Sequence, residues 1–227
     1  MTAVDELLAI GDDALVAAQR LGEWCSRGPE MEEDVALANV ALDQLGVARL
    51  VLSYAGEADG RTEDDLAYLR EDFEFRNCLL VELPNGDFAT TIGKLLLLSG
   101  YQKPLYESLV DGPDERLGAI ADKARKESAY HLEHSALWTV RLGDGTDESH
   151  RRMQAAVDEL WPYTHELYAG NDAWLSTVES VLAEATLERP DGGWQPGGGR
   201  RGVHTEHLGY LLAEMQVLHR AHPGARW

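Results

Sequence analysis

The chain has 227 residues, of which 44% are hydrophobic, and its 40 acidic residues outnumber its 20 basic residues to give a net charge of −20. A surface this acidic repels phosphate backbones, which disfavours nucleic acid as a partner. The length suits one globular domain, and the hydrophobic share is enough for a sizeable core. The acidity leaves two interpretations open, which are simple solubility and attraction to a basic partner protein.

The sequence shows no sign of secretion or membrane insertion. No segment offers about 18 unbroken apolar residues, so we expect no transmembrane helix. The N-terminus reads Met-Thr-Ala-Val-Asp-Glu and lacks the basic start and apolar run of a signal peptide. Cys25 and Cys78 are the only cysteines, and we expect both as reduced thiols. These features together predict a cytoplasmic protein.

The first half of the chain has the pattern of long helices. Asp5–Trp24 places small and apolar residues on one stripe, and a second, longer helix is predicted over Glu30–Glu57. Thr62–Leu69 is short and acidic at its start, as a helix N-terminus should be. Pro84-Asn-Gly-Asp87 predicts a turn, with Asp87 as the N-cap of a strongly apolar helix over Phe88–Leu109.

The second half continues in the same way. A fourth long helix is predicted over Glu115–Leu142, and Asp147–Tyr168 resumes helix with a kink or early end at Pro162. Asn171–Leu187 follows, and a final helix is predicted over Val203–His219. On that final helix we expect an inward-facing set, namely Leu208, Leu211, Leu212, Met215 and Leu218. Long helices joined by short turns predict an all-α, ferritin-like antiparallel helical bundle with additional C-terminal helices, forming one domain over residues 1–227.

Two helices carry the outline of a di-iron carboxylate site without its histidines. Such a bundle needs a Glu from each of two helices and a Glu-x-x-His pair from each of two others. The corresponding motifs here read Asp43-Gln-Leu-Gly46 and Glu127-Ser-Ala-Tyr130. Glycine cannot ligate a metal, and a neutral tyrosine is a poor substitute for imidazole at an Fe(II) site. The pattern indicates a subunit that supports a reaction without performing it.

The third long helix argues further against iron. Its central part, Thr90–Gly100, contains Lys94 and no carboxylate. The ammonium of Lys94 could extend to solvent, or it could point inward and neutralise Asp43 or Glu127 in place of a metal cation. His131 stands one turn after Glu127, where a satisfied buried polar pair is a better interpretation than a metal ligand. We regard Asp43, Lys94, Glu127 and His131 as a vestigial polar site and predict no catalytic residue, metal or cofactor in this chain.

Other polar positions give weaker signals. On the second helix, Asn39 and Asp43 lie beside an apolar set formed by Val35, Ala38, Leu42 and Leu45, which favours a hydrogen-bonded interior position for Asp43. His204-Thr-Glu-His207 has two histidines but no obvious third ligand, so a capped helix start or an interface is preferred over zinc. Arg200 and Arg201 could meet an anion or an acidic partner.

Many separate segments, in order along nearly the whole chain, resemble the C subunits of the bacterial ring-1,2-phenylacetyl-CoA epoxidases, which belong to multicomponent monooxygenases. The segments that carry the resemblance are Leu21–Cys25, Glu33–Asn39, Ala41–Asp43, Gly46–Arg49, Glu82–Ala89, Lys126–Leu132, Leu142–Asp147, Gly199–Gly209 and Leu212–Gln216. The resemblance implies a ferritin-like subunit without iron, paired with a homologous di-iron catalytic subunit and served by other subunits and a reductase. It implies a scaffolding role in the epoxidation of phenylacetyl-CoA.

Alternatives from other functional classes stay open. One is an oxidoreductase with its own di-iron centre, built from Glu23, Asp43, Glu127 and His131 in an unusual set. Another is a ferritin-like cage for iron storage or peroxide removal. A homodimer of this chain is also open. Four tryptophans are candidates for core or interface anchors, namely Trp24, Trp161, Trp174 and Trp194.

Overall fold

A computed structural model describes residues 3–168 and 172–225, and within these ranges every regular element is helical and none is a strand. The all-α prediction is therefore confirmed. The contacts of the chain group into two compact units. We call Met1–Pro84 together with Gly197–Trp227 the split unit, and Asn85–Pro196 the central unit.

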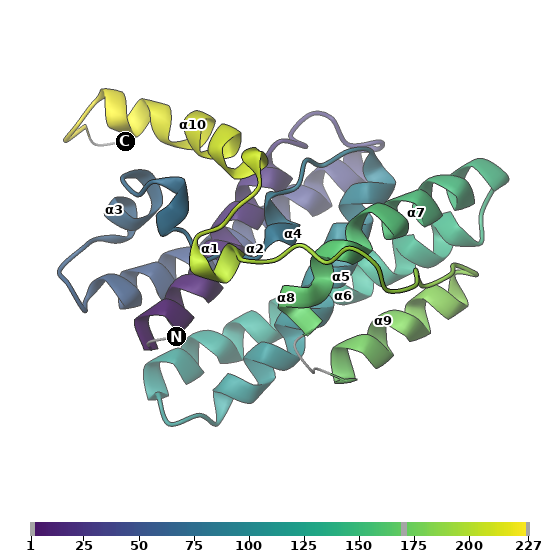
Figure 1. Ribbon diagram of the computed structural model, residues 1–227, viewed down its shortest axis with the longest axis horizontal. Coiled ribbons are helices and arrows are strands. Elements are labelled where there is room, and N and C mark those ends of the chain that lie inside the picture. The colour runs from purple at the N-terminus through teal and green to yellow at the C-terminus, as the bar shows by residue number, and fades with distance from the viewer. Residues whose placement is uncertain (1–2, 169–171, 226–227) are drawn as a thin grey trace. The chain divides into compact units, whose positions relative to one another are not determined.

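The split unit is built on a helical hairpin. Helix α1, Ala3–Gly22, packs along α2, Met31–Gly56, and residues 23–30 join them (Figure 1). Gly11 allows the close approach, because a Cβ there would stand 2.7 Å from Cδ2 of Leu52, well inside van der Waals contact. The core of this hairpin contains Ala14, Val16 and Val51, all fully buried.

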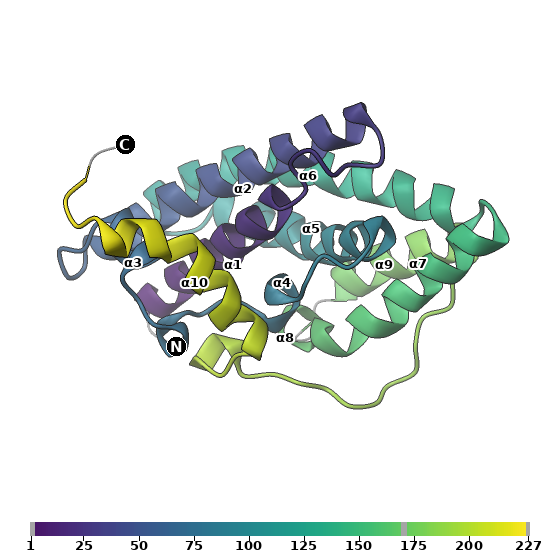
Figure 2. The same cartoon turned by 90° about the horizontal axis from the view of Figure 1, so that it is seen from above.

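Shorter elements complete the split unit. Helix α3, Glu63–Tyr68, starts at a capping box in which Thr62 and Asp65 bond each other's backbone N–H groups. Helix α10, Glu206–Ala221, packs on α3 and begins at its N-cap Thr205 (Figure 2). The remaining elements are η1, Asp72–Glu74, α4, Leu79–Glu82, and η3, Gly199–Arg201.

The central unit is a second hairpin with three further helices beside it. Helix α5, Phe88–Val110, packs along α6, Glu115–Gly143, and Asp87 caps α5 as predicted (Figure 2). Helix α7, Asp147–Leu160, contacts both helices of the hairpin. Two short elements follow, η2, Trp161–Thr164, and α8, His165–Tyr168, before α9, Asp172–Glu184, packs against α5 and α6.

Most predicted helix boundaries agree with the structure within a few residues. The early end predicted near Pro162 is confirmed, because α7 stops at Leu160 and a 3-10 turn carrying this proline takes over. The prediction that Leu218 faces inward is wrong, since Leu218 is 53% exposed. Leu208, Leu211 and Leu212 are buried as predicted. In its last turns, α10 buries a narrower face than the apolar pattern of the sequence predicted. A single domain over residues 1–227 stays a prediction.

Candidate functional site

Lys94 lies in the interior of the protein, on α5. The residue is 8% exposed, and its Nζ donates a hydrogen bond to Oδ1 of Asn85 at 3.1 Å. A Lys94 ammonium in bulk solvent would have contradicted the inward-facing interpretation. The structure instead buries the Lys94 side chain. The pairing of Lys94 with a core carboxylate stays a prediction.

The two predicted polar residues of α6 differ in their surroundings. His131 is buried, at 3% exposure. The Glu127 carboxylate forms an ion pair with Nζ of Lys123, at a distance of 3.0 Å. Tyr130, at the position where a di-iron motif would place its histidine, is 72% exposed. Its side chain therefore points away from the α6 face that carries His131.

Helix α2 carries apolar residues on two faces, and only one of them is covered. The covered face repeats at intervals of three and four residues and includes Leu37, Val40, Val47 and Val51. The opposite face repeats in the same way but is exposed, and it consists of Met31, Val35, Ala38, Leu42 and Leu45. We call this second set the α2 stripe. Asp43 lies beside the stripe. We expected it in the interior, but it is only half-buried.

The length and composition of α2 would also allow it to cross a membrane. The core helix of a soluble protein passes the same test, so this feature is weak support for a span. Ten residues of α2 are buried within the protein, including Gln44 and Glu33. The absence of a membrane-spanning helix stays a prediction.

The residues at the expected ligand positions do not fit a di-iron centre. Gly46 offers no side chain, Tyr130 is exposed, and Glu127 is engaged by Lys123. Among the residues that the structure describes, no three His, Cys, Asp or Glu side chains are grouped as a metal site requires. We therefore derive no metal chemistry from this site.

The split unit contains a buried ionic network that the sequence did not reveal. Asp12 of α1 is fully buried and forms a two-pronged ion pair with Arg70, whose Nη1 donates to Oδ2 at 3.0 Å. The backbone N–H of Arg76 donates to the same carboxylate oxygen at 2.8 Å. The guanidinium of Arg70 also lies 4.0 Å from the centre of the Phe75 ring. Both oxygens of the carboxylate are thus satisfied by residues 58 or more positions away.

The neighbouring carboxylate, Asp13, receives donors from two distant segments. The Cys78 N–H donates to Oδ1 at 2.7 Å, and Nη2 of Arg200 donates to Oδ2 at 2.7 Å. Burial raises the pKa of Asp13 above its ordinary value, and the nearby Arg200 charge opposes but does not cancel that effect. Arg200, expected to meet an anion or acidic partner, meets a carboxylate of its own chain.

A third buried carboxylate, Glu82, connects α4 to the start of α10. Its Oε1 accepts from the Thr205 N–H at 2.7 Å, and its Oε2 lies 3.0 Å from Nδ1 of His204. The other ring nitrogen of His204 lies 3.1 Å from the Phe75 carbonyl oxygen. The imidazole therefore bridges the Glu82 carboxylate and the backbone of the segment 70–82. The capped helix start expected at His204–His207 is present, with Thr205 as the N-cap of α10.

Glycines allow the C-terminal segment to reach this network. Gly202 has φ of 78°, in the left-handed region, and a Cβ there would stand 2.1 Å from the Phe73 carbonyl oxygen. This turn leads directly from Arg200 to His204. The three buried carboxylates therefore tie α1, the segment 70–82 and the segment 200–205 together.

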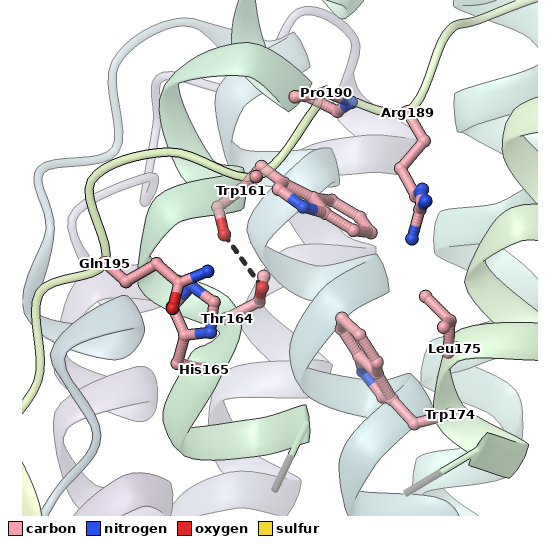
Figure 3. A pocket seen from close by; sticks show the side chains of 9 residues that line it. Trp161, Thr164, His165, Trp174, Leu175, Arg189, Pro190 and Gln195 are labelled. Atoms are coloured by element: carbon pink, nitrogen blue, oxygen red, sulfur yellow. Dashed lines mark hydrogen bonds between the residues drawn. The ribbon is translucent and has the colours of Figure 1, made fainter. Parts of the chain in front are cut away.

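The central unit contains a small pocket (Figure 3). Its cavity measures about 180 Å³, and two indoles, a guanidinium and an imidazole contribute to its lining. The lining residues are Trp161, Thr164, His165, Trp174, Leu175, Arg189, Pro190, Gly192 and Gln195. The sequence marks the two tryptophans as candidate anchors but gives no sign that they meet.

A second, more open cavity of about 480 Å³ lies between α6 and α9. Ala136, Leu137, Val140 and Val181 supply its apolar lining, and the charged residues Glu133, Arg141 and Glu184 also line it. Leu137 is 59% exposed. The two cavities are thus of different kinds, since the first is small and has an aromatic lining, whereas the second is larger and has aliphatic and charged residues in its lining.

Comparison with known sequences identifies the family. The profile described as "Phenylacetic acid catabolic protein" matches residues 1–173 and 169–227. The chain belongs to this family. It is also 45% identical, over 97% of both chains, to the C subunit of the 1,2-phenylacetyl-CoA epoxidase of Escherichia coli strain K12.

Membership in the phenylacetic acid catabolic family confirms the resemblance seen in the sequence. The chain is a homologue of an epoxidase C subunit, with an all-α, ferritin-like fold, and it belongs to phenylacetate catabolism. The name of the relative describes one component of an assembly, which implies partners for that protein. Among the described residues, those of the ion-pair network and of the vestigial polar site do not line either of the two cavities above.

Proposed function

We propose that this chain is a non-catalytic structural subunit that scaffolds the homologous di-iron catalytic subunit of a cytoplasmic phenylacetyl-CoA epoxidase. The observation that carries the proposal is the α2 stripe. A helix that is apolar on two faces is suited to a position between two layers, but the described part of this chain covers only one face of α2. A partner is the simplest source of the second layer.

The geometry of the stripe fits a helix of another subunit. Its members follow steps of four, three, four and three residues, the spacing that lets one helix pack its side chains between those of another. From Met31 to Leu45 the stripe extends about 21 Å at the usual rise per residue. Leu42 is 64% exposed and Val35 is 55% exposed, which is costly for apolar side chains in a free chain.

The ligand positions support the non-catalytic part of the proposal. A lysine stands on α5 where a di-iron bundle would use a carboxylate, and the glutamate of α6 is paired with Lys123. In this interpretation the catalytic subunit holds the metal and the substrate. The present chain contributes an apolar surface that keeps the catalytic subunit folded and active.

The test is co-purification with the catalytic subunit encoded by the same organism. The variant Leu42→Glu places a charge in the middle of the stripe, and we expect the affinity for the catalytic subunit to fall at least about tenfold, because a buried interface residue is replaced by an unpaired charge. Leu218→Glu is the matched control, since Leu218 is similarly exposed but lies on α10. The control should retain full affinity, and circular dichroism should show both variants to be helical.

Two results would overturn the proposal. Unchanged binding by Leu42→Glu would remove the stripe from the interface. About two irons bound per chain, measured on the purified subunit, would instead favour the alternative of an oxidoreductase with its own di-iron centre. A stripe that pairs two copies of this chain would appear as a dimer that Leu42→Glu dissociates in the absence of any partner.

A further inference from the structure

The small pocket of the central unit lies where η2, the start of α9 and the segment 189–195 meet. All of its described lining residues belong to the central unit. None of them takes part in the α2 stripe, the vestigial polar site or the buried ionic network. The pocket therefore needs an explanation of its own.

Its walls present aromatic surface in a fixed arrangement. The rings of Trp161 and Trp174 are 5.9 Å apart between centroids and inclined by 35°. Trp174 is held in place because its Nε1–H donates to the Leu97 carbonyl at 2.9 Å and the residue is 1% exposed. Leu175 adds an aliphatic side to the same wall (Figure 3). A flat apolar group could lie on this surface without any rearrangement of Trp174.

One positive charge stands at the edge of the aromatic wall. The guanidinium carbon of Arg189 is 5.9 Å from the centroid of the Trp161 ring, and Figure 3 shows the side chain extending beside that ring toward Leu175. Its Nη1 is 3.3 Å from Oε1 of Glu179, and both side chains are nearly half exposed. Such an exposed ion pair is weak. A guanidinium has five N–H donors, so a second carboxylate can bind it in a two-pronged geometry.

We propose that this pocket binds a small aromatic carboxylate, with its ring on Trp161 and Leu175 and its carboxylate on Arg189. The volume fits the proposal, because a cavity of about 150 Å³ holds a benzene ring. A cavity of about 180 Å³ therefore accommodates one ring with a short acidic arm. A ring without the acid would lose the contact with Arg189, and an acid without the ring would lose the indole surface.

The direct test is titration of the whole purified chain with phenylacetate, monitored by calorimetry and by ligand-observed NMR. Phenylacetamide is the matched neutral probe, since it keeps the ring and the arm but removes the charge. We expect saturable binding of one phenylacetate per chain and at least about tenfold weaker binding of phenylacetamide, because a charge-assisted bond to the guanidinium is lost. Equal binding of the two probes, or no saturable binding of phenylacetate, would overturn the proposal.

Three variants locate the binding in the pocket. Arg189→Gln should weaken phenylacetate binding at least about tenfold, whereas Glu179→Gln should tighten it by about threefold, because it removes the carboxylate that competes for the guanidinium. Arg151→Gln is the control, since Arg151 pairs with Glu148 on the surface of α7 and should leave the affinity unchanged. Undiminished binding by Arg189→Gln would overturn the assignment of the pocket.

These outcomes are distinct from those of the scaffold proposal. Co-purification of the stripe variants measures binding of the catalytic subunit. Titration of the central-unit variants with phenylacetate measures binding in the pocket. Loss of either result leaves the other standing.

Discussion

The buried carboxylates of the split unit and the buried hydroxyls of the central unit find their hydrogen-bond partners in different ways. In the split unit, the carboxylates of Asp12, Asp13 and Glu82 meet donors from segments 58 to 187 positions away in the chain. In the central unit, buried hydroxyls on α5 and α6 bond carbonyls one turn back on their own helix. These bonds join Ser99 to Leu95 at 2.6 Å, Ser135 to His131 at 2.8 Å and Thr139 to Ser135 at 2.8 Å.

The difference follows from how each unit is assembled from the chain. The central unit is one continuous segment, so no distant part of the chain has to be brought into it. The split unit must join an N-terminal segment to a C-terminal one, and a hydrophobic surface alone does not fix which segments meet. A buried carboxylate accepts only a precise set of donors, because leaving it unpaired costs several kcal/mol. We infer that the ionic network sets the register between α1, the segment 70–82 and the segment 200–205.

The largest expected effect comes from breaking this network. Arg70→Ala leaves the Asp12 carboxylate buried without its guanidinium, and we expect the free energy of unfolding to fall by about 3–5 kcal/mol. Denaturant unfolding of the whole chain measures the change. Arg151→Ala, which breaks only an exposed pair on the central unit, should cost less than about 1 kcal/mol. Similar losses in the two variants would contradict a register-setting role for the network.

A smaller effect is expected from the vestigial polar site. If Lys94 neutralises a core carboxylate in place of a metal, a double-mutant cycle that combines Lys94→Met with Asp43→Asn or Glu127→Gln should give a coupling energy of about 1–3 kcal/mol. The reference is the cycle between Lys123 and Glu127, an ion pair whose lysine is 63% exposed, for which we expect about 0.3–0.5 kcal/mol. Coupling energies for Lys94 no larger than this reference would show that the lysine does not replace the metal.

The sequence predicted local structure better than burial. Helix starts at Thr62 and Asp87, and the helix end before Pro162, depend on residues within one turn of the boundary, so their patterns were visible. The α2 stripe was visible as an apolar set, but its exposure was not, because Leu42 and Leu45 would look the same on a covered face. The partners of Asp12, Asp13 and Glu82 lie far along the chain, and no spacing rule connects them.

The smallest expected effect is a pH dependence that separates Asp13 from the surface carboxylates. Burial raises the pKa of Asp13 in the folded state above the unfolded value of 3.8, so the folded state binds more protons between these two values. Stability contributed by this residue is therefore lost as the pH rises through that interval. Exposed carboxylates behave oppositely, since hydrogen bonds from Thr62 lower the pKa of Asp65 and favour folding at higher pH. Because these other groups are unchanged in Asp13→Asn, the stability of the natural chain minus that of the variant should decrease as the pH rises above about 4. Unfolding curves collected across this range measure the difference, and a flat or rising difference would show that Arg200 and the Cys78 N–H outweigh the burial of the carboxylate.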